Sequence, residues 1–291
     1  MRARDAMTRA AGTLHAAGLP SPVPDARILL THVLGSNHAL LIVPDLTDSQ
    51  RTEFNHMVSR RASGEPVQHI TGVAPFRYEE LRVGPGVFIP RPETELLVEE
   101  ALHMLAARPV TERRVVELCA GSGAITLSLA KELGGLQLHA VEISDRAWPY
   151  LVENLEGVDV ELRHDDMTNA FHELDALVDL VIANPPYVPE MDREILPSDV
   201  VGVDPEGALF SGADGMDALR AVHDVARRLL RPGGWVMAEH DEKQSTDVLE
   251  LFGSPDFEST VDHRDLNDRP RYVVAQRSGD AQRAGVAGLA P

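Results

Sequence analysis

Apolar residues recur at intervals of three and four over the first sixty-odd positions, which is the spacing of amphipathic helices. The pattern predicts one helix over residues 4–18 and a second over residues 24–36. Thr47 and Gln50 resemble a capping box at the start of a third helix. We therefore expect residues 1–63 to form a small helical bundle that serves as a substrate-recognition domain.

From Gly64 the pattern changes to short extended stretches, Val67–Thr71 and Leu81–Val83, punctuated by Gly and Pro. This pattern predicts a β-hairpin linker over residues 64–88. Next comes Ile89–Glu95, in which two prolines stiffen a charged loop ahead of a helix. That segment could be an ordinary helix start, or it could form one wall of a binding cleft.

From residue 89 onward, apolar stretches alternate with helical patterns, the order typical of α/β domains. We expect such a domain over residues 89–276. Its predicted strands are residues 114–118, 136–141, 158–163, 178–183, 235–239, 257–261 and 271–275, of which the last two form a closing antiparallel pair. Asp204–Leu209 is expected to be a loop over the site. Residues 277–291 are rich in Gly, Ala and Ser, which predicts a disordered tail.

A glycine-containing turn, Cys119–Gly123, follows the first strand and precedes a helix. Gly121 and Gly123 allow a ligand to approach the backbone, and the N-terminus of the helix offers N–H groups to a carboxylate. A dinucleotide fingerprint would need glycine at position 126, where the chain has Thr126, so a pyrophosphate is disfavoured. A cofactor with an amino-acid tail and a nucleoside fits better.

The next two strand ends carry groups that suit a nucleoside. Glu142 ends the second strand, where a carboxylate can accept hydrogen bonds from a ribose diol. Asp166 follows the third strand and could accept from the exocyclic amine of an adenine, while Met167 packs on the ring. For a lone Asp after a strand, a solvated turn is the commoner explanation.

The fourth strand ends at Asn184, followed by Pro185, Pro186 and Tyr187. The two prolines fix φ and remove two N–H donors, so the carbonyls of Asn184 and Pro185 become rigid acceptors. Together with the Asn184 amide oxygen and the Tyr187 ring, they could hold a flat NH2 group. A turn with a proline pair is the alternative. Four polar strand ends at one sheet edge favour the functional interpretation.

Charge and composition narrow the class of substrate. The chain of 291 residues carries a net charge of −19, and nine Arg against eight acidic residues in residues 1–90 leave −20 on the remainder. Such a surface would repel a phosphate backbone, which disfavours a nucleic-acid substrate. Cys119 is the single cysteine, which suits a reducing cytoplasm. We expect no membrane span and, because the twelve His lack ligand spacing, no metal.

These features together resemble the HemK/PrmC family of protein-glutamine N-methyltransferases, from about residue 4 to 276. The resemblance is carried by the motifs Gly64–Gln68 with Ile70–Gly72, Ile89–Glu95, Gly121–Ile125 and Asn184–Tyr187. It implies a seven-stranded, Rossmann-like, S-adenosylmethionine-dependent methyltransferase domain preceded by the helical bundle and the hairpin linker. The implied substrate is the glutamine of the Gly-Gly-Gln loop in peptide chain release factors, and the implied product is S-adenosylhomocysteine.

The resemblance also assigns roles to residues. It places the methionine end of the cofactor at Cys119, Ala120, Gly121, Ser122 and Gly123, the ribose at Glu142, and the adenine at Asp166 and Met167. It makes Asn184, Pro185 and Tyr187 catalytic, with Asn184 also beside the cofactor, and adds Pro186, Arg91 and Pro92 as substrate contacts. Cys119 departs from the family's usual glycine, and Asp204-Pro205 from its usual Glu-Pro.

Two rival functions use the same features. Nucleic-acid amino-methyltransferases acting on adenine N6 or guanine N2 share the Asn-Pro-Pro-Tyr tetrad, but the acidic domain and the lack of a basic target-recognition segment disfavour them. An inactive cofactor-binding regulator of release factors is the second rival, and the intact tetrad speaks against it. We expect a cytoplasmic monomer.

Overall fold

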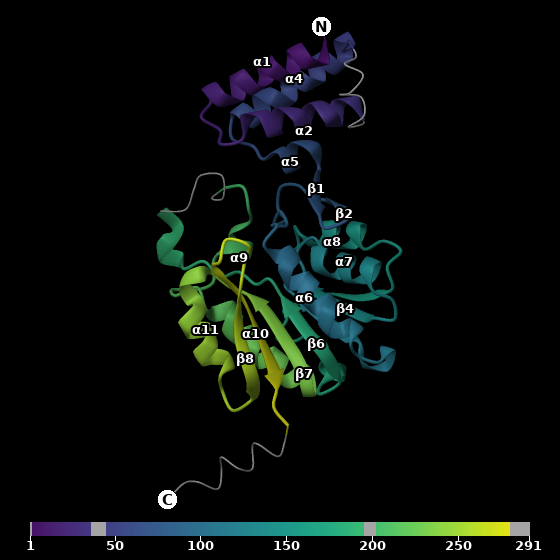
Figure 1. The fold of residues 1–291 in the computed structure, drawn as a ribbon, viewed down its shortest axis with the longest axis vertical. Helices are drawn as coiled ribbons and strands as arrows, with labels where there is room; N and C mark the ends of the chain where they lie inside the picture. Colours follow the sequence, from purple (N-terminus) through teal and green to yellow (C-terminus); the bar gives the residue numbers. More distant parts are fainter. Residues whose placement is uncertain (1, 36–44, 195–201, 280–291) are drawn as a thin grey trace, which may run out of the picture. The chain divides into compact units, whose positions relative to one another are not determined.

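The computed structural model describes residues 2–35, 45–194 and 202–279 (Figure 1). The chain divides into two compact units. One unit contains Met1–Val73, Val83–Pro85 and Pro197–Val203, and the other contains the remainder of the chain. Each unit has its own core, so each is described separately.

The first unit is the predicted helical bundle, formed by α1 (Ala3–Ala16), α2 (Pro22–Leu34), α4 (Asp48–Ala62) and the short α5 (Val67–Thr71). The capping box predicted at the start of α4 is confirmed, because Thr47 Oγ1 accepts from Gln50 N at 3.2 Å and Gln50 Oε1 accepts from Thr47 N at 3.1 Å. Inside the bundle, Arg61 Nε donates to Asp25 Oδ2 at 2.7 Å, with both side chains buried.

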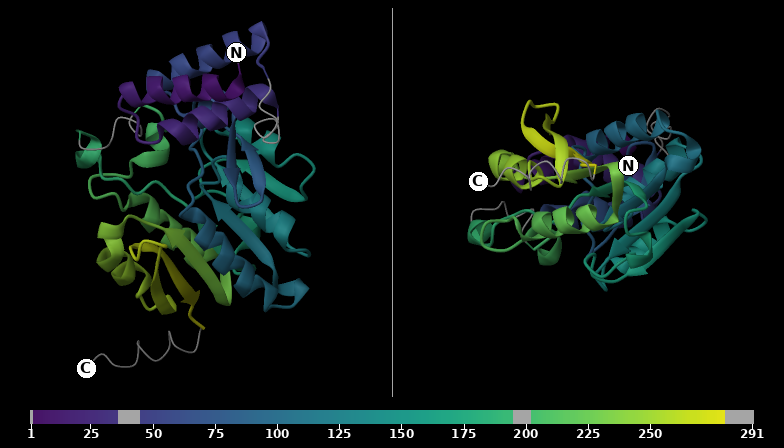
Figure 2. Two further views of the ribbon diagram at one scale, coloured as in Figure 1. Left: turned by 45° about the horizontal axis from the view of Figure 1, so that its top comes forward. Right: turned by 90° about the horizontal axis from the view of Figure 1, so that it is seen from below.

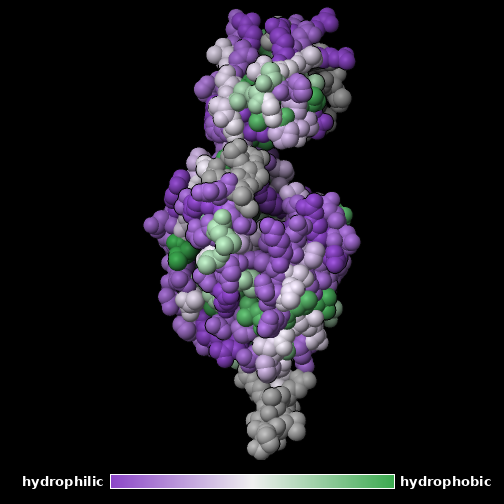
Figure 3. Space-filling model, turned by 90° about the vertical axis from the view of Figure 1, so that its left-hand side faces the viewer, coloured by the Kyte–Doolittle hydropathy of each residue, from purple (hydrophilic) through white to green (hydrophobic). Residues whose placement is uncertain are grey.

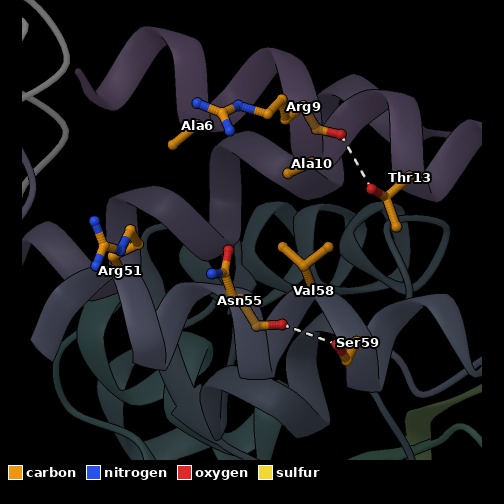
Figure 4. A pocket seen from close by; sticks show the side chains of 8 residues that line it. All are labelled: Ala6, Arg9, Ala10, Thr13, Arg51, Asn55, Val58 and Ser59. Carbon is orange, nitrogen blue, oxygen red and sulfur yellow. Dashed lines mark hydrogen bonds between the residues drawn. The ribbon is translucent and has the colours of Figure 1, made fainter. Parts of the chain in front are cut away.

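A cavity of about 610 Å³ lies between α1 and α4 within this unit. Both small apolar and polar side chains line it (Figure 4). The lining residues are Ala6, Arg9, Ala10, Thr13, Arg51, Asn55, Val58 and Ser59. None of the predicted site residues is among them, so this cavity does not mark the predicted chemistry.

The predicted strand at Val67–Thr71 is wrong, because this segment is α5. Pro66 precedes the helix and Gly72 ends it in the left-handed conformation at φ 77°. Val67 and Ile70 lie three positions apart, and both are buried in the helical core. The hairpin itself exists, but it begins later than predicted, with β1 (Val73–Phe76) and β2 (Glu79–Arg82) as its arms.

The second unit is built on a seven-stranded sheet, as predicted, in the order β5-β4-β3-β6-β7-β9-β8. Its strands are β3 (Arg114–Leu118), β4 (Gln137–Glu142), β5 (Val160–His164), β6 (Val178–Ala183), β7 (Leu230–Glu239), β8 (Phe257–Arg264) and β9 (Pro270–Arg277). The first five strands are parallel, and β9 runs antiparallel to both β7 and β8. The sequence predicted all seven strands and the antiparallel closing pair.

Helices cover both faces of this sheet (Figure 2). They are α6 (Thr94–Ala106), α7 (Ala124–Glu132), α8 (Trp148–Asn154), α10 (Asp217–Leu229) and α11 (Ser245–Phe252). Val181 and Ala183 of β6 share a core cluster with residues of α10 and α11. Leu180 and Ile182 are equally buried, yet they point to the other face because successive strand residues alternate. Because the side chains on both faces of β6 are buried, the strand is apolar at nearly every position.

The large exposed apolar side chains are scattered, with Tyr78, Met191 and Leu266 the most exposed among the described residues. Hydrophilic residues dominate the face of the molecule seen in Figure 3. No helix in the described ranges is long and apolar enough to cross a membrane.

The predicted start of the tail at residue 277 is wrong. Arg277 is the last residue of β9, pairs with Phe257, and donates from Nε to Arg227 O at 3.1 Å. Ser278 N donates to Asp256 O at 3.0 Å. Ordered structure therefore continues past 277, while residues 280–291 lie outside the described part of the chain.

Candidate active site

The four polar strand ends meet at one edge of the sheet, as the sequence predicts. Leu118 of β3 lies opposite Val141 of β4 and Ala183 of β6, and Glu142 lies opposite His164 of β5. The strand order reverses at β3, whose neighbours are β4 and β6. In open α/β sheets the ligand crevice lies outside the carboxyl ends of the strands at such a reversal.

The loop after β3 leaves open space beside its backbone. Ala120 N donates to Val141 O at 3.0 Å, and Gly123 N closes a turn onto Ala120 O at 2.7 Å. A Cβ built on Gly121, at φ 55°, meets no atom within 4 Å, whereas one on Gly123 lies 2.8 Å from Leu151 Cδ1. Gly121 thus leaves room for a ligand, while Gly123 is needed for packing against α8.

Glu142 ties this loop to the end of β4. Its Oε2 accepts from Gly121 N and its Oε1 from Ser144 N, both at 2.7 Å, and the residue is buried. Each carboxylate oxygen has a second lone pair, so Glu142 can still accept hydrogen bonds from two hydroxyl groups. The Ser144 hydroxyl accepts from Ala147 N in the turn that precedes α8.

Asp166 and Met167 lie beside the first loop. Asp166 Oδ1 accepts from Thr168 Oγ1 at 2.7 Å and Thr168 N at 2.8 Å, and these bonds lower the pKa of Asp166. The residue therefore forms a local turn and is also an ionised acceptor. Met167 Sδ lies 3.8 Å from Cys119 Sγ, which brings the ends of β3 and β5 together. Burial raises the pKa of the Cys119 thiol, so it stays protonated.

Glu117 is a buried acid beneath the loop that the sequence analysis assigned no role. Its Oε2 accepts from Thr126 N at 2.9 Å and also bonds the Thr126 hydroxyl, so it caps the N-terminus of α7. Burial raises the pKa of Glu117 to about 8, against the opposing effect of the Thr126 hydrogen bonds. The sequence feature that could have identified Glu117 is an acidic residue among the apolar residues of a buried strand.

Asn184 is held by a chain of hydrogen bonds that leads to the buried side chains of Thr94 and Glu239. Asn184 Nδ2 donates to Thr94 Oγ1 at 3.1 Å, and Thr94 Oγ1 donates to Glu239 Oε2 at 2.6 Å. Tyr187 Oη donates to the other oxygen, Glu239 Oε1, at 3.2 Å. Thr94 is 4% and Glu239 2% exposed. Burial raises the pKa of Glu239, while the Thr94 hydroxyl and the positive charge of Arg271 oppose that rise.

Thr94 and Glu239 were missed as site residues by the sequence analysis. Thr94 is the first residue of α6, and Glu239 is the last residue of β7, so one looks like a helix start and the other like a strand end. The usable signal was that β7 is a fifth parallel strand whose carboxyl end must reach the same sheet edge as Asn184.

The backbone of the tetrad is fixed as well. Tyr187 O accepts from Gln244 Nε2 at 2.9 Å, and a Cβ on Gly215 would lie 2.3 Å from the same oxygen. Burial raises the pKa of the Tyr187 hydroxyl, so it remains a donor. Pro185 is buried, and no donor among the described residues bonds its carbonyl. The Pro185 carbonyl and Asn184 Oδ1 are therefore acceptors that the described residues leave unused.

The Arg91 guanidinium already forms an ion pair with another side chain of the same compact unit. Its Nη2 donates to Asp204 Oδ2 at 2.5 Å, and Asp204 Oδ1 accepts from Ile89 N at 3.4 Å. The Asp204 side chain is fully buried, so the departure from the family's Glu-Pro supplies the anchor of Arg91. Pro92 is exposed. The expected loop at 204–209 contains a short helix, α9 (Glu206–Leu209), instead.

Two family models and several known relatives match this chain. The PrmC N-terminal domain family matches residues 5–72, and the methyltransferase small domain family matches residues 85–198. The chain is 46% identical over 264 residues to the release factor glutamine methyltransferase of Streptomyces coelicolor, covering 90% of this chain and 93% of the relative. It is 41% identical to that of Mycolicibacterium smegmatis over 280 residues, covering 95% and 98%.

Among solved structures, the catalytic domain of hMettl16 in complex with the MAT2A 3′UTR hairpin 6 is similar in fold. The TM-score is 0.53 at 13% identity, covering 80% of this chain and 82% of the other. At that identity the likeness concerns the fold alone.

Proposed function

The chain belongs to the family of release factor glutamine methyltransferases, and from this premise we propose how it acts. It transfers the methyl group of S-adenosylmethionine to the side-chain amide nitrogen of the glutamine in the Gly-Gly-Gln loop of a peptide chain release factor. The observation that carries this proposal is a pair of acceptors, Asn184 Oδ1 and the Pro185 carbonyl, that no donor in the described part of the chain bonds, beside a fixed Tyr187. An NH2 group supplies the two hydrogens that these acceptors need.

The residues at the sheet edge fit S-adenosylmethionine. The open space at Gly121 accommodates a ligand against the backbone, and Glu142 has acceptor capacity for a ribose diol. Asp166 is ionised and can accept from an adenine amine beside Met167. Cys119, Ala120, Ser122 and Gly123 complete the loop for the methionine end. When bound, S-adenosylmethionine supplies an electrophilic methyl group on a sulfonium.

The protein's own contribution is positioning. An amide nitrogen is a poor nucleophile because its lone pair is delocalised into the carbonyl. Hydrogen bonds from its two N–H groups to Asn184 and Pro185 favour a more tetrahedral nitrogen with an exposed lone pair. The Tyr187 ring, held through Glu239, packs on the amide plane, with Pro186, Arg91 and Pro92 around it. The nitrogen loses its proton after transfer, so no strong base is needed.

The rival functions lack this support. A net charge of −20 over residues 91–291 repels the phosphates that a nucleic-acid methyltransferase must bind. The intact acceptor pair would have no purpose in an inactive regulator. Release factors work with cytoplasmic ribosomes, so we place the reaction in the cytoplasm. The monomeric state stays a prediction.

Mass spectrometry of a release factor after incubation with the protein and S-adenosylmethionine tests the proposal. A mass increase of one methyl group, located on the Gly-Gly-Gln glutamine, is the expected result. A release factor in which that glutamine is replaced by glutamate is the control, because a carboxylate has no NH2 to donate. An unchanged mass, or methylation of the control at the same rate, contradicts the proposal.

A further inference from the structure

We propose that Thr94 and Glu239 are positioning residues that fix the orientation of the Asn184 amide, so that its oxygen and not its NH2 group faces the substrate. This inference rests on the proposed function, because it explains how the acceptor side of Asn184 is selected. Neither residue is placed in contact with the reacting atoms. Their effect passes through Asn184.

The direction of the hydrogen bonds carries the inference. Thr94 donates its single hydroxyl proton to Glu239 Oε2 at 2.6 Å. The Thr94 oxygen then has only lone pairs for its other neighbour, so Asn184 must present Nδ2, at 3.1 Å. The two sides of an Asn amide have nearly the same shape, and the hydrogen-bond partners decide between them.

Tyr187 strengthens this selection by bonding the second oxygen of the Glu239 carboxylate. Its hydroxyl donates to Glu239 Oε1 at 3.2 Å, so each oxygen of the carboxylate receives one hydroxyl proton. Thr94 and Glu239 are both nearly inaccessible to solvent, and water is therefore a poor substitute for these bonds. The network links α6, β7 and the tetrad after β6 inside one compact unit.

The orientation has a chemical consequence. With Oδ1 outward, Asn184 and the Pro185 carbonyl are both acceptors and match an NH2 group. With the amide reversed, an Asn184 N–H would face a substrate N–H, and that hydrogen bond would be lost. The Thr94–Glu239 pair thus favours an amide NH2 over a carboxylate or a carbonyl oxygen at this position.

Substitution of Thr94 separates the hydroxyl from the shape of the side chain. Thr94→Val keeps the β-branched shape and removes the hydroxyl, and we expect kcat on a release factor to fall about 10- to 100-fold. Affinity for S-adenosylmethionine should stay within about twofold, because the Thr94 hydroxyl bonds Asn184 Nδ2 and Glu239 and does not bond the loop at Cys119–Gly123. Thr94→Ser keeps the hydroxyl and should restore kcat to within about threefold of the wild type.

A matched control removes a threonine hydroxyl elsewhere in the same unit. Thr260 Oγ1 on β8 donates to Phe252 O at 2.7 Å, away from the tetrad. Thr260→Val should keep the wild-type kcat. Wild-type kcat in Thr94→Val, or equal losses in Thr94→Ser and Thr94→Val, would overturn the inference. The same holds if Thr260→Val loses as much kcat as Thr94→Val, since the loss would then reflect general destabilisation.

A spectroscopic readout keeps the inference separate from the proposed function. The side-chain NH2 signals of Asn184 can be identified by their absence in an Asn184→Ala variant of the full-length protein labelled with ¹⁵N. In Thr94→Val, and in Glu239→Gln, which places an NH2 in the network, we expect those signals to shift and their hydrogens to exchange faster. Unchanged signals would overturn the network, whereas an unmodified release factor with perturbed signals would count only against the proposed substrate.

Discussion

Glu142 Oε2 accepts the N–H of Gly121 at 2.7 Å, so the carboxylate at the end of β4 also fixes the loop that follows β3. Through its other oxygen it fixes Ser144 in the loop that follows β4 itself. One side chain thus joins the loops that follow two neighbouring parallel strands, β3 and β4. Glu142, the residue proposed to bind the ribose, therefore also holds the loop that is proposed to bind the methionine end of the cofactor.

Substitution of Glu142 should weaken binding of S-adenosylmethionine. Hydrogen bonds to a charged group are worth roughly 1.5 to 3 kcal/mol, so Glu142→Ala should lower the affinity by about 10- to 150-fold. Calorimetric titration measures this effect. Glu161→Ala, which removes an exposed acid on the neighbouring β5, is the matched control and should bind normally. An unchanged affinity in Glu142→Ala would reject the ribose assignment.

Substitution of Asn184 should abolish most turnover and leave the affinity for S-adenosylmethionine nearly unchanged. Loss of one preorganised polar contact from a transition state costs on the order of a hundredfold, which is the expected effect of Asn184→Ala on kcat. Asn184→Asp should be as damaging, because a carboxylate cannot donate to Thr94. Steady-state kinetics on a release factor measure both variants. Substantial activity in Asn184→Asp would show that the donated hydrogen bond is dispensable.

The sequence predicted the sheet and the edge at which its polar strand ends meet, because both depend on local pattern. Buried parallel strands are apolar at nearly every position, so β3 and β6 stand out, and a parallel sheet brings their carboxyl ends to one edge. Asn184 and Glu142 follow directly from that geometry. The family motifs then supplied the chemistry that the geometry leaves open.

The residues that were missed depend on contacts between distant segments. Thr94 and Glu239 are 145 positions apart, and nothing local in either segment indicates that their side chains meet. The helix at Val67–Thr71 was mistaken for a strand because five residues contain too little of either period. Packing of Val67 and Ile70 into the helical core decides its conformation.

The helical unit should be dispensable for the cofactor but not for the protein substrate. Its nearly neutral charge, beside −20 on residues 91–291, motivates a role in recognising the release factor. Because Val67 and Ile70 belong to the helical core, the deletion should span residues 2–72 and not end at Gly64. We expect S-adenosylmethionine affinity within a few-fold of the wild type and loss of methylation of the intact release factor.

A short Gly-Gly-Gln peptide serves as the control substrate for that deletion. The full-length and shortened proteins should methylate it equally, because the peptide reaches only the site on the second unit. Full methylation of the intact release factor by a folded deletion variant would make the bundle a structural support alone.

Glu117 should make the stability of the protein depend on pH. Its pKa is raised to about 8 in the folded protein, well above the ordinary value of a glutamic acid. Between these two values the folded state binds more protons than the unfolded state, so the free energy of unfolding falls as the pH rises. The stabilisation is complete below the unfolded pKa and is lost as the pH passes through about 8.

Glu117→Gln tests this dependence, since glutamine keeps an acceptor for Thr126 N and cannot ionise. Urea unfolding at about pH 5 and about pH 8 should show the wild type losing a few kcal/mol more than the variant over that interval. The two proteins share every other titrating group, so the difference between their slopes isolates Glu117. Parallel slopes would mean that Glu117 ionises at its ordinary pKa, in which case the N–H groups of α7 stabilise a carboxylate beneath the cofactor loop.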